Sequence, residues 1–245
     1  MPRQCTLESI LSRDSIVKNG QLINYYQPII DNKSDVVALE ALVRLKVPNK
    51  GVLYPSAFLS KFEHCRLFDN VLLNAIHDIG FYEVPYRISL NLPPSLLENS
   101  SFYKYFVSRC EEYNICPSRF KVEITETEYY DCSMSLVKNI LKLKQYGVGI
   151  SIDDFGVGYS SLDKILKLPI DELKIDRIFI LDSQYDFKKR CILESMSDLT
   201  RKLDIMVVAE GVENTDTYDF IKKLNINYFQ GYLFSAPKPL GDLFG

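Results

Sequence analysis

The chain has 245 residues, of which 47% are hydrophobic and 25% charged, and its formal net charge is −3. This length supports one domain with a substantial core, and the composition is typical of a globular protein rather than a disordered one. The slightly acidic balance argues against a partner of polymeric DNA or RNA, but it is compatible with a small anionic ligand held by metal ions. We expect a single domain over residues 1–245, with its core at about residues 20–240.

Targeting and membrane segments are not expected. Charged residues interrupt the first 20 positions, which argues against a secretory signal. No stretch reaches the ~18 apolar residues that span a bilayer. The six cysteines are scattered without a Cys-x-x-Cys pair, as is typical of free thiols in a reducing cytosol. We therefore expect a cytoplasmic protein that has no membrane partner.

Strand-like and helix-like segments alternate along the chain. Apolar runs bounded by turn residues predict strands at Ile23–Ile30, Val36–Leu45, Arg87–Leu92, Phe120–Thr127, Gly149–Phe155, Leu173–Ile180, Ile205–Val212 and Tyr228–Phe234. Helical periodicity predicts helices at Asp69–Ile79, Pro94–Tyr113, Ser133–Tyr146, Ser160–Leu168, Phe187–Leu203 and Thr215–Leu224. Ser133 and Asn214 are expected to be N-caps.

This order predicts an α/β fold, a modified TIM (β/α)₈ barrel. Eight strands that alternate with helices over ~250 residues match the size and rhythm of that fold. Only residues 31–35 separate the first two strands, whereas a parallel crossover needs a dozen or more residues, so we expect one antiparallel strand near the N-terminus. The alternative is an open doubly wound sheet, which would normally show a Gly-rich first βα turn; that turn is absent here.

Polar side chains interrupt strands that should be apolar. Barrel strands are buried on both faces, and a buried ionised carboxylate costs several kcal/mol unless it is paired or metal-bound. Most of these polar residues lie toward the C-terminal halves of their strands, where barrels place their active sites. The set comprises Glu40, Asn91, Glu123, Asp153, Asp154, Lys174 and Glu210.

The charge of this set points to metal ions. Five carboxylates and one lysine leave a charge of −4, which two divalent cations would balance. Hard oxygen ligands suit Mg²⁺ or Mn²⁺, and the adjacent Asp153 and Asp154 favour a carboxylate bridge between two ions ~3.5–4 Å apart. Each acid taken alone is better explained as a strand-end cap, a surface residue or half of a salt bridge. Their recurrence on successive strands favours a two-metal hydrolase.

The same residues carry a resemblance to a known family. Glu40-Ala41-Leu42, followed by Val43-Arg44, is similar to the E-x-L-x-R motif of the EAL-domain cyclic di-GMP phosphodiesterases. The resemblance continues in order over nearly the whole chain. Its further motifs are Tyr-Gln-Pro-Ile at 26–29, Ser-Leu-Asn-Leu at 89–92, Glu-Ile-Thr-Glu at 123–126, Asp-Asp-Phe-Gly at 153–156, Leu-Lys-Ile-Asp at 173–176, Ala-Glu-Gly-Val-Glu at 209–213 and Gln-Gly-Tyr at 230–232.

The resemblance implies a metal-dependent phosphodiesterase that opens cyclic di-GMP to linear 5′-pGpG by two-metal activation of water. Such an enzyme would lower cellular cyclic di-GMP in biofilm and motility signalling. The resemblance assigns one cation to Glu40, Asn91, Glu123 and Asp153. It assigns the second cation to Asp153, Asp154 and Glu210, and it makes Glu40, Lys174 and Glu210 catalytic, with Lys174 on the attacking water. The expected cofactors are two Mg²⁺ or Mn²⁺ ions, with Ca²⁺ inhibitory because it prefers longer bonds and higher coordination.

Further roles implied by the resemblance concern the substrate and a loop. Gln27, Leu42 and Arg44 would contact the dinucleotide, and Gln230 would complete the substrate site and orient it. Glu126 would brace the loop after the paired aspartates, which links metal binding to a homodimer. No sensory or GGDEF-like segment precedes these motifs, so we expect a stand-alone EAL domain. A protein partner in addition to the substrate is compatible with this sequence.

Several alternatives stay open at this point. Lys174 is also explained by an ion pair with Asp176, and Arg44 by a surface or ion-paired position. The whole chain is also compatible with a catalytically weak EAL protein that binds cyclic di-GMP as a receptor or holds a regulator protein. The sequence departs from the family pattern at Leu45, Val157 and residues 62–67, none of which is an expected metal ligand.

Overall fold

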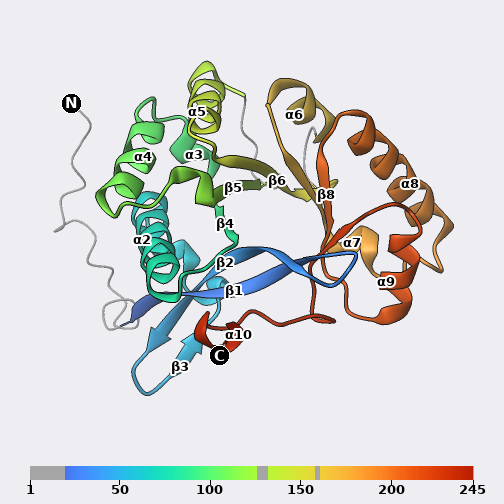
Figure 1. The fold of residues 1–245 in the computed structure, drawn as a ribbon, viewed down its shortest axis with the longest axis horizontal. Coiled ribbons are helices and arrows are strands. Elements are labelled where there is room, and N and C mark those ends of the chain that lie inside the picture. Colours follow the sequence, from blue (N-terminus) through green and yellow to red (C-terminus); the bar gives the residue numbers. More distant parts are fainter. Residues whose placement is uncertain (1–19, 126–131, 158–160, 245) are drawn as a thin grey trace.

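The computed structural model describes residues 20–125, 132–157 and 161–244 (Figure 1). Its strands are β1 (Gln21–Asp31), β2 (Val36–Val47), β3 (Gly51–Leu53), β4 (Arg87–Asn91), β5 (Phe120–Thr125), β6 (Gly149–Phe155), β7 (Glu172–Ile175), β8 (Met206–Ala209) and β9 (Tyr228–Phe229). Its α-helices are α2 (His64–Tyr82), α3 (Pro94–Leu97), α4 (Phe102–Glu112), α5 (Met134–Gln145), α6 (Ser161–Lys167), α7 (Arg177–Ile180), α8 (Phe187–Lys202), α9 (Thr215–Lys222) and α10 (Gly241–Phe244). Short 3₁₀ turns lie at Pro55–Ala57, Leu59–Lys61 and Pro117–Arg119.

Eight of these strands close into a barrel. The order around the ring is β1-β9-β8-β7-β6-β5-β4-β2, a β1–β2 pairing completes it, and β3 lies outside on β2. Strand β1 is antiparallel to both of its neighbours, whereas the pairs from β2–β4 round to β8–β9 are parallel. The predicted modified barrel is therefore confirmed, and the open doubly wound sheet is wrong.

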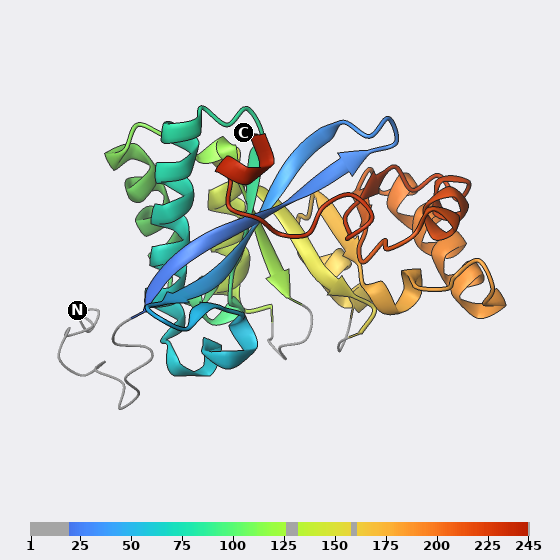
Figure 2. The ribbon, with the colours of Figure 1, turned by 90° about the horizontal axis from the view of Figure 1, so that it is seen from below.

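The reversal of β1 follows from a tight turn. Asp31 Oδ1 accepts hydrogen bonds from the backbone N–H groups of Lys33 (2.8 Å) and Asp35 (3.0 Å), and Ser34 adopts a left-handed φ of 70°. A carboxylate that binds backbone two and four residues onward closes the chain locally and leaves no room for a crossover helix. The chain therefore enters β2 beside β1 and in the opposite direction (Figure 2).

Two predicted boundaries are wrong because side chains of turn residues cap the backbone. The predicted strand Leu173–Ile180 ends at Ile175, since the carboxylate of Asp176 accepts the N–H of Ile178 (2.7 Å) and starts α7. The predicted helix Pro94–Tyr113 is divided into α3 and α4. At the break, Asn99 Oδ1 accepts the N–H of Ser101 (3.1 Å), which competes with the helical hydrogen bonds.

Other boundaries differ more modestly. Helix α2 is longer than the predicted Asp69–Ile79, β8 and β9 are shorter than predicted, and β3 was not predicted. Ser133 and Asn214 are confirmed as N-caps, because their side chains accept the N–H groups of Leu136 and Thr217. Glu126 and Thr127 lie outside the described residues, as does Ser160.

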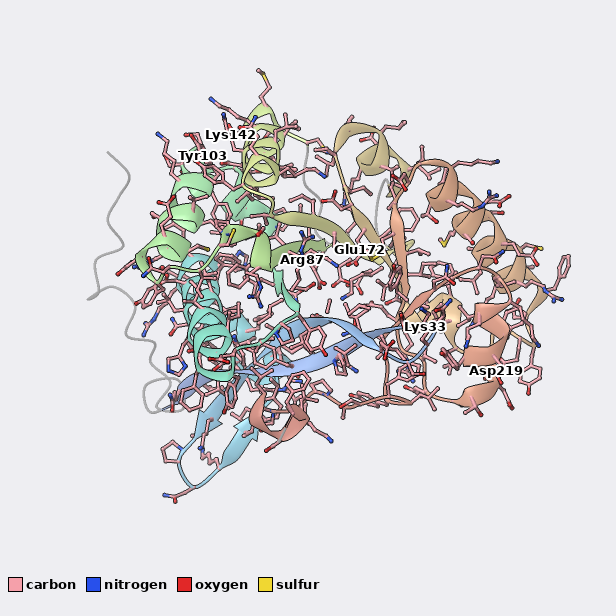
Figure 3. The ribbon with its side chains drawn as sticks, viewed as in Figure 1. Lys33, Arg87, Tyr103, Lys142, Glu172 and Asp219 are labelled. Carbon is pink, nitrogen blue, oxygen red and sulfur yellow. The ribbon has the colours of Figure 1, made fainter. Side chains whose placement is uncertain are left out.

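Most of the apolar core lies between the barrel and its helices, and a smaller cluster of Ile29, Ala38 and Val208 fills part of the barrel interior. Outward-facing residues of the strands, such as Ile88, Val122 and Ile150, are fully buried against α2, α4 and α5. The barrel interior also holds polar side chains, among them Glu172 (Figure 3), which forms a buried ion pair with Lys121. Removing one partner of such a pair leaves an uncompensated charge and costs about 3–5 kcal/mol.

Candidate active site

The predicted polar residues gather at the carboxyl ends of the parallel strands. Side chains alternate across a strand, so every second residue of each strand points into the barrel. Glu40 projects from β2, Asn91 ends β4, and Glu123 projects from β5 directly beside Asn91 in the strand register. The remaining residues of the group come from β6, β7 and the chain just after β8 and β9: Asp153, Asp154, Lys174, Glu210 and Gln230.

Lys174 stands at the centre of this group. Its side chain is fully buried, and its Nζ lies 3.1 Å from Glu40 Oε2 and 3.0 Å from Glu123 Oε2. The same nitrogen lies 2.6 Å from Glu210 Oε1 and 3.4 Å from Asp153 Oδ1. These four carboxylates come from four different strands or strand ends, and the alternative pairing with Asp176 is wrong.

Amide side chains hold the carboxylate of Glu40 from both sides. Asn91 Nδ2 donates to Glu40 Oε1 (3.0 Å), and Gln230 Nε2 donates to Glu40 Oε2 (2.6 Å). Gln230 also donates to Gln27 Oε1 (3.2 Å), and Gln27 in turn donates to the carbonyl of Ser235 (3.0 Å). A carboxylate with both oxygens bound has one orientation, so Glu40 is preorganised.

A second group of oxygens lies beside Lys174. One carboxylate oxygen each from Asp153, Asp154 and Glu210 lies within 4.8 Å of the others. Strand β6 is irregular here, because its register with β7 shifts between Ile152 and Phe155 and Asp154 has a φ of 53°. This irregularity lets two consecutive aspartates serve one site, although consecutive strand residues normally face opposite ways.

These donors fit hard divalent cations. They are carboxylate and amide oxygens, the ligands that Mg²⁺ and Mn²⁺ prefer. Glu123 is fully buried, and its Oε1 has no hydrogen-bond partner among the described residues. A buried carboxylate oxygen without a donor is costly, and a cation would satisfy it.

Comparison with known proteins identifies the family. The model of the EAL domain matches residues 9–237 of the chain. This chain belongs to the EAL-domain family. Its similar relatives include the cyclic di-GMP phosphodiesterase RocR of Pseudomonas aeruginosa, which is 30% identical over 98% of this chain and 64% of its own length. The Escherichia coli cyclic di-GMP phosphodiesterase PdeR is 30% identical over 91% of this chain and 35% of its own length. This EAL domain therefore spans about one to two thirds of these relatives.

Solved structures of EAL domains share the fold. An EAL domain protein from Listeria monocytogenes is 32% identical with a TM-score of 0.85, over 94% of this chain and 93% of that one. The PaMucR phosphodiesterase in its c-di-GMP complex is 32% identical with a TM-score of 0.82, over 91% and 94% of the two chains. Klebsiella pneumoniae BlrP1 has been solved with cy-diGMP and either calcium or manganese; each structure is 28% identical with a TM-score of 0.78, over 89% of this chain and 56% of that one.

The carboxylates of this EAL domain do not share one charge state. Burial would raise the pKa of Glu40, but Lys174 and the amide donors hold that pKa below its usual range. Burial and the neighbouring acids raise the pKa of Glu123 to about 8, that of Asp154 to about 6, and that of Glu210 well above its usual range. Burial opposes the charge on Lys174, yet the surrounding carboxylates raise its pKa well above the ordinary value.

We expect cation binding by the EAL domain to weaken as the pH falls below about 8. The raised pKa of Glu123 means that the metal-free site holds a proton at neutral pH, and a cation must displace it. For each proton that the cation must displace, the apparent Kd of the cation rises about tenfold for every pH unit below that pKa. The stability of the metal-free protein changes in the opposite direction. Without metal, the folded state binds the extra proton, so its free energy of unfolding falls as the pH rises from about 4.5 to about 8.

Thermal unfolding with Mg²⁺ and with EDTA at pH 6 and pH 8.5 measures this effect. The increase in Tm caused by Mg²⁺ should be larger at pH 8.5. A Glu123→Gln variant, which cannot exchange that proton, should show a smaller difference between the two pH values. Equal Mg²⁺-dependent increases at both pH values in the wild type would contradict the prediction.

The residues expected to contact substrate border the metal-site oxygens. Gln27 and Leu42 line a cavity of about 260 Å³ together with Glu40, Gln230 and the exposed Tyr232. Gly231 also lines this cavity, and no larger residue fits there, because a Cβ would lie 2.1 Å from the carbonyl oxygen of Val212. The loop residue Glu126 lies outside the described residues, so its bracing role stays a prediction.

Arg44 is buried, so its interpretation as a surface residue is wrong. Its guanidinium lies over the rings of Tyr54 (4.8 Å to the ring centroid) and Tyr25 (5.4 Å), and its Nη1 donates to the carbonyl of Val43 (2.9 Å). These two tyrosines were not predicted from the sequence. Tyr25 lies in a strand that was predicted from the sequence. Only the antiparallel register of β1 with β2 shows that its side chain lies on the same face as Arg44.

Proposed function

We propose that this EAL domain hydrolyses cyclic di-GMP to linear 5′-pGpG with two Mg²⁺ or Mn²⁺ ions, and so lowers the cellular level of the dinucleotide in biofilm and motility signalling. The observation that carries the proposal is the fully buried Lys174 amid four carboxylates, with a further acidic group beside it. The names of the relatives RocR and PdeR support the substrate.

The expected metal ligands form two sets, one for each cation. Glu40, Asn91, Glu123 and Asp153 would hold one cation, and Asp153, Asp154 and Glu210 the other. Bound there, the cations would lower the pKa of the attacking water and offset charge on the phosphate oxygens.

The protein's own groups then position the reactants. Lys174 has only donors, so it hydrogen-bonds the attacking oxygen without competing for a cation. Asn91 and Gln230 hold Glu40 in one orientation. Gln27, Leu42 and Arg44 hold the dinucleotide, with the guanidinium of Arg44 on a phosphate.

The test is hydrolysis by the purified domain. We expect 5′-pGpG to form with Mg²⁺ or Mn²⁺ and not with Ca²⁺, because Ca²⁺ prefers six to eight ligands at 2.3–2.6 Å and would distort a site built for shorter bonds. Chromatography of the nucleotides measures the product, and Ca²⁺ added to the Mg²⁺ reaction should inhibit it.

Three results separate the candidate functions. Turnover with Mg²⁺ or Mn²⁺ supports the enzyme, and equal turnover with Ca²⁺ would contradict the compact two-metal site. Binding of cyclic di-GMP without turnover under either ion would indicate a receptor. If the protein neither binds nor hydrolyses cyclic di-GMP, the protein-interaction module is the remaining candidate function.

A homodimer and a cytoplasmic location complete the proposal. Met134 at the start of α5 and Leu162 and Leu166 on α6 are apolar side chains 91%, 61% and 85% exposed, and they offer a surface for a second copy. Light scattering of the wild type and of Leu166→Lys would test the dimer. The cysteines at 65, 110, 116 and 191 are free thiols, which fits a reducing compartment. Within the described residues no helix combines the length and apolarity needed to cross a bilayer. The single-domain boundaries also stay a prediction.

A further inference from the structure

A cavity of about 410 Å³ lies between β1 and α2, on the outside of the barrel. Its walls come from β1, β2, β3, α2 and the segment before α10, and we call it the β1–α2 cavity. The described residues that line it include none of the expected metal ligands or substrate contacts. Its volume lies within the ~300–1,000 Å³ range of small-molecule sites, and a single metal ion would leave most of it unfilled.

The β1–α2 cavity forms where a short β-ladder stops. Tyr26 and Lys238 exchange two backbone hydrogen bonds (2.6 and 3.0 Å) on the edge of β1 that faces away from β2. The next pair in this antiparallel register would be Asn24 and Leu240, but no backbone hydrogen bond joins these two residues. The chain from Pro239 turns into α10 instead (Figure 1). The edge of β1 therefore stays open at Asn24.

Oxygen acceptors line the wall that β1 and α2 form. Asn24 is 7% exposed; its Nδ2 donates to the carbonyl of Val71 (2.9 Å), and its Oδ1 has no hydrogen-bond partner among the described residues. Asn74 Nδ2 donates to the carbonyl of Leu22 (3.0 Å), which leaves its Oδ1 as an acceptor. Asp78 follows Asn74 by four residues on α2, so the two side chains share one face of the helix. A ligand on this wall must donate hydrogen bonds.

The carboxylate of Asp78 has weak charge compensation. Its Oδ2 accepts the hydroxyl of Tyr26 (2.6 Å), which is a neutral donor. Its Oδ1 lies 3.6 Å from Nδ1 of His77, too far for a hydrogen bond, and the side chain of His77 is 75% exposed. Lys46 also lines the cavity, but it is exposed and forms no ion pair with any described residue. A cationic group inside the cavity would therefore gain Asp78 as its charge partner.

Aromatic rings and alkyl side chains complete the β1–α2 cavity. Tyr25 and Tyr82 line it, and the faces of such rings attract ammonium groups. Ile23, Val52 and Leu240 add apolar surface on which a short alkyl chain would pack. An ammonium group has three donors and no acceptor, which matches a wall that carries three side-chain acceptors.

We propose that the β1–α2 cavity binds a small organic amine through a primary ammonium group. The ammonium donates to Asp78, Asn24 and Asn74, and the alkyl chain of the ligand packs against Ile23 and Val52. The site is separate from the metal centre, so this inference goes beyond the proposed function and does not depend on it.

Calorimetry with putrescine, a linear diamine, tests the site in the intact chain. Saturating Mg²⁺ is present, so that the acidic metal site does not take up the amine. We expect the wild type to bind putrescine and not 1,4-butanediol, which has the same chain length without charge. Asp78→Asn removes the charge but keeps an acceptor for Tyr26. It should raise the Kd for putrescine about 10- to 100-fold, the range for losing a hydrogen bond to a charged group.

Two further variants act as a control and as an independent test. Lys46→Met removes an exposed cation from the same cavity, so the Kd for putrescine should stay equal or fall. Val52→Trp fills part of the cavity without changing an acceptor, so it should weaken binding, and it decides the question if Asp78→Asn does not fold. Tyr25 is left unchanged because its ring also contacts Arg44.

Each contrary result overturns the inference. If the wild type does not bind putrescine, or binds 1,4-butanediol equally well, the cavity is not an ammonium site. An unchanged Kd in folded Asp78→Asn or in Val52→Trp places the amine elsewhere on the protein. Weaker binding in Lys46→Met would contradict a cationic ligand at this position.

Discussion

Replacing Lys174 by methionine should lower kcat for cyclic di-GMP by about 10³-fold, within the range for loss of a group that handles the nucleophile's proton. Methionine fills a similar volume but cannot hydrogen-bond the attacking oxygen. The variant also leaves Glu40, Glu123, Asp153 and Glu210 without their buried counter-charge. The metal-free variant should therefore unfold at a lower temperature than the wild type, and Mg²⁺ should restore more of its stability.

A lysine on the outer surface provides the control. Lys142 lies on the exposed side of α5 and donates to Gln145 (Figure 3). Lys142→Met should keep wild-type kcat and Tm. Turnover of Lys174→Met within tenfold of the wild type, measured under saturating Mg²⁺ and substrate, would remove Lys174 from the catalytic mechanism.

Replacing Glu40 by alanine should abolish measurable turnover, a loss of about 10³-fold or more, while the protein stays folded. The change removes a carboxylate that three donors hold, namely Asn91, Lys174 and Gln230. Mn²⁺ binding, followed by electron paramagnetic resonance, should weaken in Glu40→Ala, whereas in Lys174→Met it should not. This difference separates a ligand from a group that positions the nucleophile.

The control for Glu40 is Glu98→Ala, at an exposed glutamate that follows α3. It should keep turnover and Mn²⁺ binding. Unchanged activity in Glu40→Ala would exclude Glu40 from the site, and loss of the folded state, seen as a missing thermal transition, would show that its role is structural.

Much of this site could be predicted because strand periodicity is a strong signal. A charged residue inside an otherwise apolar strand, such as Glu123 or Lys174, is seldom stable unless a shared polar site pairs its charge. Parallel strands bring their carboxyl ends to one edge of the barrel, which places these residues together. The antiparallel start of the barrel was equally predictable, because the loop between the first two strands is too short for a crossover.

What the sequence did not predict depends on local hydrogen bonds or on distant neighbours. A single cap by Asp176 decides between strand and helix, although the residues around it are apolar enough for either. The stacking of Arg44 on Tyr54 joins β2 to a residue beyond β3.

The reversed β1 also decides where the polypeptide enters the fold. Gln21 pairs with Lys46 near the end of β2, so the first residue of β1 lies on the same edge of the barrel as the active site (Figure 2). In an all-parallel barrel that residue would lie at the opposite end. From Gln21, one straight strand of about 20 Å leads to Gln27, which binds Gln230 and through it Glu40. A force or a partner that acts on the chain just ahead of Gln21 therefore acts on the substrate side of the barrel. Strand β1 alone connects that point to Gln27 and its hydrogen-bond link to Glu40.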